Sequence, residues 1–201
     1  MNAMSSEKRK YDLKARAEAQ QQTRQRIVQV TMELHKELGP AQTTISEIAR
    51  RAGVQRLTVY NHFPHEAELV GACQAHWLAL HPPPDVGAAF AGTDPVRRVA
   101  TVLGAFYTWY RETAAMAEKV QRDREAVPAL DTLLQQTGDA ALDQLAAGLA
   151  DGFGGANGGR MRRPMIRLAL DFWTWRRLAH EGLDDEEAAA LMATAVDSAG
   201  K

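Results

Sequence analysis

The sequence predicts an all-α protein of eight or nine helices. Alanine supplies 35 of the 201 residues, and Leu, Gln, Glu and Arg are also frequent, a mixture that favours helix over strand. Apolar residues recur every three or four positions, whereas no segment alternates with a period of two for long enough to indicate a strand. The 45% apolar and 24% charged residues are ordinary for a globular protein long enough to bury a core.

The composition also excludes several classes of protein. A single cysteine excludes an internal disulfide framework and a metal site built from several cysteines. No run of about 18 apolar residues exists, so no membrane span is expected, and the N-terminus lacks the apolar segment of a signal peptide. We therefore expect a protein of the reducing cytoplasm and predict no metal and no cofactor.

The net charge of −1 hides an asymmetry between the two parts of the chain. Residues 1–64 carry 11 basic and 6 acidic side chains, whereas residues 65–201 carry 13 and 19. A basic head on an acidic body is typical of a polyanion-binding module attached to something else. The alternative is that the short basic tail only improves solubility.

Capping and breaking residues predict the helices of the first half. Thr44 followed three residues later by Glu47 is a capping box, Gly39-Pro40 and Gly53 end helices, and Pro82 to Pro84 form a decisive break. The predicted helices cover about 21–38, 45–52, 55–63 and 66–80. Residues 1–20 form either a frayed arm or a helical extension of the first helix, and the sequence leaves both open.

The second half continues with longer helices. Asp94 caps a helix of about 95–125 with Pro95 at its first position. After the loop 85–93 and this long helix, we expect a short helical turn at 130–134, a helix of about 139–152 and a flexible glycine-rich linker at 152–160. Pro164 is expected to open a single helix of about 164–181, and Asp184 with Glu187 to cap the last helix.

Four positions between 45 and 59 fit a helix-turn-helix. Ile45 and Ala49 share one face of the first helix, and Ala49 is small where the second helix must cross closely. Gly53 stands where the turn needs a positive φ, and Val59 is the apolar anchor of the second helix. Such a turn projects the second helix outward, so that it can enter a DNA major groove. The alternative is a plain helical hairpin within a core.

The polarity of the second helix argues against the hairpin, because so many hydrogen-bonding groups are costly in a core. Arg56 can bind guanine O6 and N7, and Gln55 or Asn61 can bind adenine in the same bidentate way. Thr44, Tyr60 and His62 can reach phosphates. The predicted DNA-binding residues are Thr44, Gln55, Arg56, Leu57, Thr58, Tyr60, Asn61 and His62.

Residues 43–63, TTISEIARRAGVQRLTVYNHF, resemble the DNA-binding domain of TetR-family transcriptional regulators, over about residues 24–70. The resemblance implies a three-helix DNA-binding head at 21–65 and a helical ligand-binding and dimerisation domain at 66–201. Three departures stand out. Gln55 replaces the usual Ser and is a poorer N-cap. Leu57 replaces the usual Gly, and either contacts a thymine methyl group or holds the helix further out. Glu66 stands where the family often has a phosphate-binding Lys.

The resemblance further implies a homodimer, a roughly palindromic operator and a small apolar or aromatic effector. The last two helices would form the dimer interface through Ile166, Leu170, Phe172, Trp175, Leu191, Met192 and Ala195. The effector pocket would be lined by Trp77, Phe106, Tyr107, Trp109, Tyr110, Met116 and Trp173, with polar tips such as Tyr110 or Arg111. For each of these apolar residues, simple core packing is the alternative. Trp173 and Trp175 are two residues apart and are not expected to share a face.

No motif in the sequence indicates catalysis. The glycine-rich segment 152–159 lacks the Lys-Ser/Thr of a P-loop and fails the dinucleotide fingerprint. Cys73 has no activating partner nearby in the sequence. We therefore expect a ligand-released homodimeric repressor. The choice of a repressor over an activator rests only on what is usual in the family that the sequence resembles. The alternative is a helical small-molecule-binding protein whose DNA-binding head is not functional.

Overall fold

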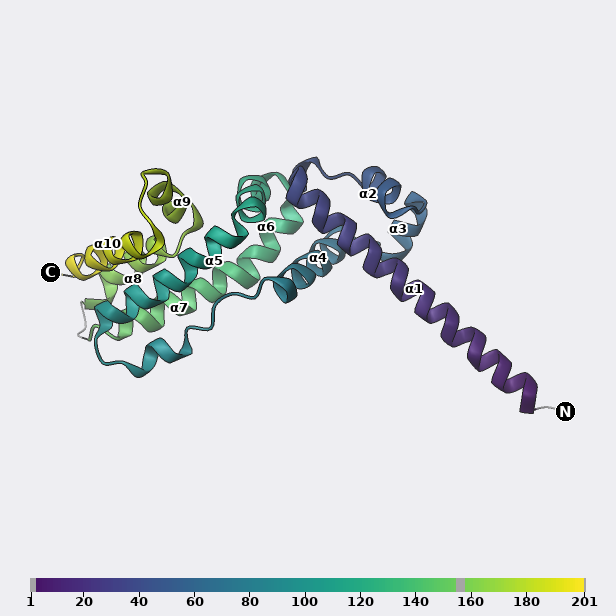
Figure 1. The fold of residues 1–201 in the computed structure, drawn as a ribbon, viewed down its shortest axis with the longest axis horizontal. Helices are drawn as coiled ribbons and strands as arrows, with labels where there is room; N and C mark the ends of the chain where they lie inside the picture. Colours follow the sequence, from purple (N-terminus) through teal and green to yellow (C-terminus); the bar gives the residue numbers. More distant parts are fainter. Residues whose placement is uncertain (1–2, 155–157, 201) are drawn as a thin grey trace.

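The computed structural model of this chain describes residues 3–154 and 158–200, and these residues form ten α-helices and no strand. Figure 1 shows an elongated molecule in which a small helical head and a larger helical body lie at opposite ends of the packed part. A single long helix projects beyond the head and carries the N-terminus. None of the described helices combines the length and the apolar character needed to cross a membrane.

The head consists of α1 (Ala3–Glu37), α2 (Ile45–Ala52) and α3 (Arg56–His62), with the 3₁₀ turn η1 (Pro40–Gln42) after α1. Residues 3–20, which the sequence left open, continue α1 without interruption as a helical extension. The second half of α1 packs on α2, and a small apolar core joins the three helices. Its fully buried large members are Ile27, Leu34, Ile48 and Val59.

Helix α4 (Glu66–Leu80) connects the head to the body, with the bounds that the sequence predicts. Its side chains pack against the head on one side and against the body on the other. Leu69 belongs to the core of the head, whereas Val70 packs with Val127 and Leu130 in a separate cluster at α6 (Pro128–Leu134). A shift of α4 would therefore change both contacts at once.

The body is built around α5 (Pro95–Asp123), which packs along α10 (Asp185–Ser198). Both predicted caps are confirmed: Asp94 accepts hydrogen bonds from two backbone N–H groups, and Asp184 forms a reciprocal capping box with Glu187. The short turns η2 (Gly87–Ala91) and η3 (Arg124–Ala126) flank α5. A turn of π-helix, η4 (Gln135–Asp139), joins α6 to α7 (Ala140–Asp151).

The predicted single helix over 164–181 is wrong. The structure has α8 (Gly158–Ala169) and α9 (Phe172–His180), and Pro164 lies inside α8 rather than at its start. The break occurs at Asp171, whose carboxylate accepts hydrogen bonds from the N–H groups of Trp173 and Thr174 and so caps a new helix. Of the predicted linker 152–160, residues 155–157 lie outside the described residues, and α8 already begins at Gly158.

Candidate nucleic-acid interface

The turn between α2 and α3 has the geometry that the sequence predicts. The Thr44 hydroxyl accepts a hydrogen bond from the Glu47 N–H at 3.2 Å and caps α2. Gly53 ends α2 with φ 65°, in the left-handed region that favours glycine. Ala49 is buried where the helices cross, and its carbonyl accepts the N–H of Val54 at 3.0 Å. These contacts hold α3 at a fixed angle on the head.

Helix α3 has one buried side and one solvent-facing side. Val59 is 0% exposed and anchors the helix in the core of the head. Gln55 stands at the N-cap without a side-chain capping bond in the described structure, in line with the poor cap expected of it. Among the predicted DNA-binding residues, the structure exposes Thr44, Gln55, Arg56, Leu57, Tyr60 and Asn61 and half-buries Thr58 and His62.

The basic residues of the head differ in how far their charge is already compensated. Arg50 and Arg51 on α2 both donate to Glu47, and Arg51 also bonds Glu37. These hydrogen bonds lower the pKa of Glu47 to about 2, so the carboxylate stays charged. Within the described residues, Arg56 has no such ion pair, so its guanidinium is available to a ligand at the exposed side of α3.

A groove of about 650 Å³ runs between the exposed part of α1 and α3. Arg16 and Arg24 border it from α1, and Thr58, Asn61 and His62 border it from α3. The described residues that line it include no carboxylate. Sequence reasoning did not find this groove, because it depends on α1 continuing as a helix past α3, which the sequence left open.

The predicted pocket residues are only partly brought together. Phe106, Trp109 and Tyr110 form an aromatic cluster on α5 with ring centroids 5.5–6.3 Å apart. Trp77 lies near them, because its ring stacks on His81, whose carbonyl accepts the indole N–H of Trp109 at 3.2 Å. The other predicted pocket residues differ in exposure: Tyr107 and Met116 are buried, and Trp173 is exposed.

The polar tips expected to meet an effector are already engaged. The Tyr110 hydroxyl donates to the Leu170 carbonyl at 2.6 Å, and Tyr107 does the same to Ala169 at 2.8 Å. Burial raises the pKa of both hydroxyls, so they remain protonated donors. Arg111 makes a bidentate pair with Asp185. The polar groups of Tyr110 and Arg111 are therefore not free: they join α5 to the connection between α8 and α9 and to α10.

The predicted dimer-interface residues face mostly inward. Ile166, Leu170, Phe172, Trp175 and Met192 belong to the main core of the body. One helix face must fill the chain's own core, and these side chains do so in the single chain. Their role in a dimer interface stays a prediction. Leu191 is exposed and Ala195 is half-buried. As expected, Trp173 and Trp175 lie on different faces, one exposed and one buried.

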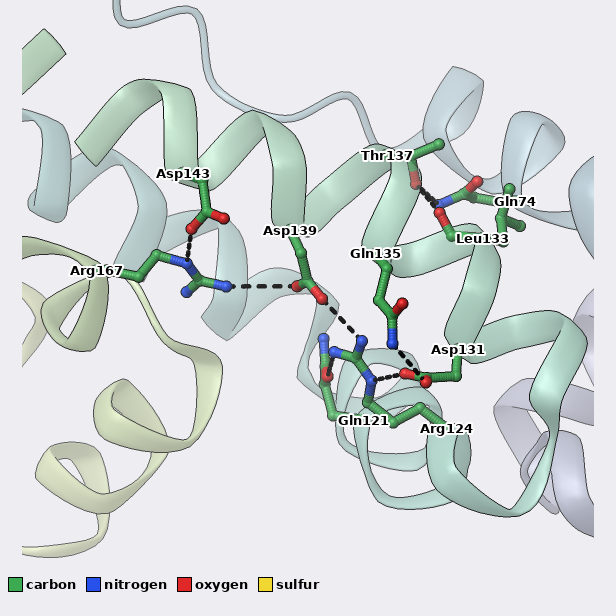
Figure 2. A network of polar contacts seen from close by, with 10 residues as sticks. All are labelled: Gln74, Gln121, Arg124, Asp131, Leu133, Gln135, Thr137, Asp139, Asp143 and Arg167. Atoms are coloured by element: carbon green, nitrogen blue, oxygen red, sulfur yellow. Dashed lines mark hydrogen bonds and ion pairs between the residues drawn. The ribbon is translucent and has the colours of Figure 1, made fainter. Parts of the chain in front are cut away.

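A chain of charged contacts crosses the body around the π-helical turn (Figure 2). Arg124 binds Asp131 and Asp139 at 2.7 Å each, and Asp139 also meets Arg167 of α8. Beside these contacts, Gln74 of α4 makes a separate one and donates to the Thr137 hydroxyl at 3.1 Å. Sequence reasoning missed this network, because residues so far apart in the chain give no periodic signal.

The described residues contain no group of three or more His, Cys, Asp or Glu that could hold a metal ion. The site that α2 and α3 build is a helix-turn-helix with a buried anchor and an exposed polar face, the geometry of a protein that reads DNA through one helix. Residues 27–73 match the family model of bacterial regulatory proteins of the tetR family. The DNA-binding head of this chain is therefore similar to that of the tetR family of regulatory proteins.

Two curated relatives are similar to part of this chain. The HTH-type transcriptional regulator SrpR and the uncharacterized HTH-type transcriptional regulator TtgW, both of Pseudomonas putida, are each 42% identical over 77 residues. The match covers 37% of this chain, 36% of SrpR and 57% of TtgW. The similarity in sequence thus covers little more than a third of this chain, and the chain spans only part of the length of either relative.

Solved structures extend the likeness in fold to the body. A TetR-like transcriptional regulator from Rhodococcus sp. RHA1 superposes with a TM-score of 0.62 at 17% identity, covering 89% of this chain and 97% of that one. NalD, the secondary repressor of the MexAB-OprM multidrug efflux pump in Pseudomonas aeruginosa, gives 0.59 at 19% identity, covering 90% and 96%. The all-α prediction of a helix-turn-helix head and a helical body is confirmed.

Proposed function

We propose that this chain is a sequence-specific DNA-binding transcriptional regulator that acts as a homodimeric repressor and is released from its operator by a small apolar or aromatic molecule. The observation that carries the proposal is the two-sided character of α3. Val59 is fully buried in the head, whereas Arg56 and Tyr60 are exposed on the same short helix. A helix held rigidly with its polar side outward can enter a major groove about 12 Å wide.

Base and phosphate contacts divide between residues by their chemistry. Arg56, without an ion pair in the described part of the chain, suits guanine O6 and N7, and Gln55 or Asn61 suits adenine. The exposed Thr44 at the N-terminus of α2 and the Tyr60 hydroxyl suit phosphates. Leu57, exposed at the start of α3, suits a thymine methyl group. These residues together define the operator half-site.

The dimer is proposed to form through the outward faces of α8 and α10. Met161, Leu168 and Leu191 are 60%, 52% and 50% exposed there, although all three are large and apolar. Large apolar side chains left exposed on packed helices are typical of a protein interface. A two-fold dimer presents two copies of α3 to one duplex, so the operator should be roughly palindromic.

Release by an effector is proposed to act through α4. This helix contributes Leu69 to the head and Val70 to the body, and Gln74 ties it to the π-helical turn. A molecule that enters the aromatic region near Trp77 and Trp109 would displace α4 and change the spacing of the two α3 helices. NalD is named a repressor, which supports the proposed sign of regulation.

We assign the DNA-binding role to the head, residues 21–65, and the ligand-binding and dimerisation roles to the body, residues 66–201.

Selection of bound duplexes from a random pool, with and without a mixture of small metabolites, tests this function. The expected result is a roughly palindromic consensus that the protein binds at least about a thousandfold more tightly than random duplex. At least one fraction of the mixture should release it. Binding that is weak and equal for selected and random duplexes would instead identify a helical small-molecule-binding protein with a non-functional head.

A further inference from the structure

The N-terminal part of α1 is a helix without a packing partner in the described chain. The described side chains of residues 13–22 are all exposed, and the helix continues to Ala3. At 1.5 Å per residue, residues 3–22 extend about 30 Å beyond the last buried turn. Figure 1 shows this segment projecting away from both the head and the body. A polar helix of this length is only marginally stable alone, so a binding partner would stabilise it.

The charge of this segment indicates the kind of partner. Residues 3–26 contain seven basic and three acidic side chains. Elsewhere in the head, Arg50 and Arg51 are compensated by Glu47 and Glu37. Arg16 forms no ion pair within the described residues, and it lines the groove against α3. The segment therefore carries much of the positive charge that the head can offer to a polyanion.

The groove is continuous with the proposed DNA-reading surface. Arg16 and Arg24 line one wall, and the opposite wall is formed by Thr58, Asn61 and His62 of α3. Arg24 is held over the ring of Phe63, with its guanidinium carbon 4.4 Å from the ring centroid. The polar side chains that line the groove can all donate hydrogen bonds. A DNA backbone that follows α3 would therefore meet donors on both sides.

We propose that the N-terminal extension of α1 is a second DNA-binding element that contacts the sugar–phosphate backbone flanking each half-site, with Arg16 as its phosphate contact. The proposal rests on the proposed function. The extension is polar on all sides, which disfavours a lipid surface or an apolar protein groove. Its length of about 30 Å is close to one turn of B-DNA, about 34 Å, so it can reach backbone beyond the bases that α3 reads.

The test compares Arg16→Ala with Lys14→Ala in the full-length protein. Both variants remove one exposed positive charge, but Lys14 is not among the residues that line the groove and instead faces Glu18 at 3.9 Å. Binding to a selected operator is measured between about 50 and 300 mM salt. Arg16→Ala should weaken binding about three- to tenfold and make the slope of log K against log salt shallower by about one per protomer. Lys14→Ala should change both much less.

The same measurement is made on duplexes with and without about one extra helical turn of flanking DNA. The wild-type protein should bind the longer duplex more tightly, and Arg16→Ala should lose most of that gain. If flanks add nothing, or if neither variant weakens binding, the extension is not a DNA-binding element although the proposed function stands. If both variants weaken binding equally, Arg16 is not the specific phosphate contact. If the wild-type protein prefers no duplex over random DNA, the proposed function fails as well. Unchanged far-UV circular dichroism verifies that both variants are folded.

Discussion

Asp123, the last residue of α5, accepts a hydrogen bond from the backbone N–H of Ala41 at 3.1 Å and so ties the body to the turn that follows α1. Arg122 orients the carboxylate and also donates to the Leu38 carbonyl. The hydrogen bond from Arg122 is the largest cause that lowers the pKa of Asp123, so the acceptor stays ionised. The head is thus attached to the body at two places, here and along α4.

Gly39 makes this attachment possible, and replacing it should destabilise the protein. Its φ is +98°, and a Cβ at this position would overlap the Asp123 carboxylate. Gly39→Ala is therefore expected to lower the free energy of unfolding by at least about 2 kcal/mol. Gly71→Ala is the matched control, because Gly71 lies in the interior of α4 with open space around it. Urea unfolding of the control should show a gain of up to about 1 kcal/mol. Equal stability of the two variants would contradict this account.

His35 makes the stability of the attachment between the head and the body depend on pH. It is buried at the end of α1, with Nδ1 3.7 Å from the Cys73 sulfur, and burial lowers its pKa from 6.5 to about 4 although Asp123 opposes the shift. The unfolded chain therefore binds a proton first as the pH falls. The free energy of unfolding should drop by roughly 2–3 kcal/mol between about pH 6.5 and pH 4 from this group.

Denaturant titrations at several pH values check the contribution of His35. The variant His35→Gln should show a smaller slope in that window, whereas His180→Gln, which alters an exposed histidine, should retain the wild-type slope. An unchanged slope in His35→Gln would assign the acid sensitivity to other groups.

The thiol of Cys73 offers a direct probe of the same attachment between the head and the body. Burial raises the pKa of its thiol to about 12, so the native protein holds little of the reactive thiolate near neutral pH. Labelling by a thiol reagent should be at least about a hundredfold slower in the native protein than in denaturant. Asp123→Ala should accelerate native labelling, because it removes the bond to Ala41, whereas Asp143→Ala, which removes a distant exposed ion pair, should not. Equal rates in native and denatured protein would contradict the buried position.

The sequence predicted the head well because its signals are local. Thr44, Gly53 and Val59 specify a cap, a left-handed turn and an anchor within one short segment, and the structure places each accordingly. The bounds that the sequence predicts for helix 66–80 also agree with the structure. The N-terminal extension was undecidable, because helix-favouring residues without an apolar stripe fit a helix and a frayed arm alike.

The body was predicted less well because its signals depend on tertiary packing. Continuous apolar residues around Asp171 concealed a helix break, since the capping carboxylate there is a single residue in an apolar run. The same richness suggested a dimer interface at Ile166 and Trp175, but these side chains fill the chain's own core. Which face of α8 meets α5 and α10 follows from the fold and not from periodicity.

The exposed side of α8 and α10 should hold the dimer together. Leu191→Glu is expected to convert the protein to a monomer at micromolar concentration, because it places a charge in a desolvated apolar interface. Its fold should survive, since Leu191 is half exposed in the single chain. Leu80→Glu, at a similarly exposed leucine at the end of α4, is the control and should remain dimeric. Analytical ultracentrifugation checks this, and a dimeric Leu191→Glu would assign the interface elsewhere.

Arg56 and Tyr60 should affect operator binding in different ways, because one is assigned to a base and the other to a phosphate. Arg56→Ala should cost about 1–3 kcal/mol on the selected operator and relax the preference at one base pair. Tyr60→Ala should weaken binding to all related operators about equally, with an unchanged far-UV helix signal. Arg97→Ala removes an exposed charge at the start of α5, far from α3, and should bind as wild type does. Fluorescence anisotropy on a panel of operators with single base-pair changes measures both effects. Wild-type affinity in Tyr60→Ala would show that α3 faces the duplex with a different side.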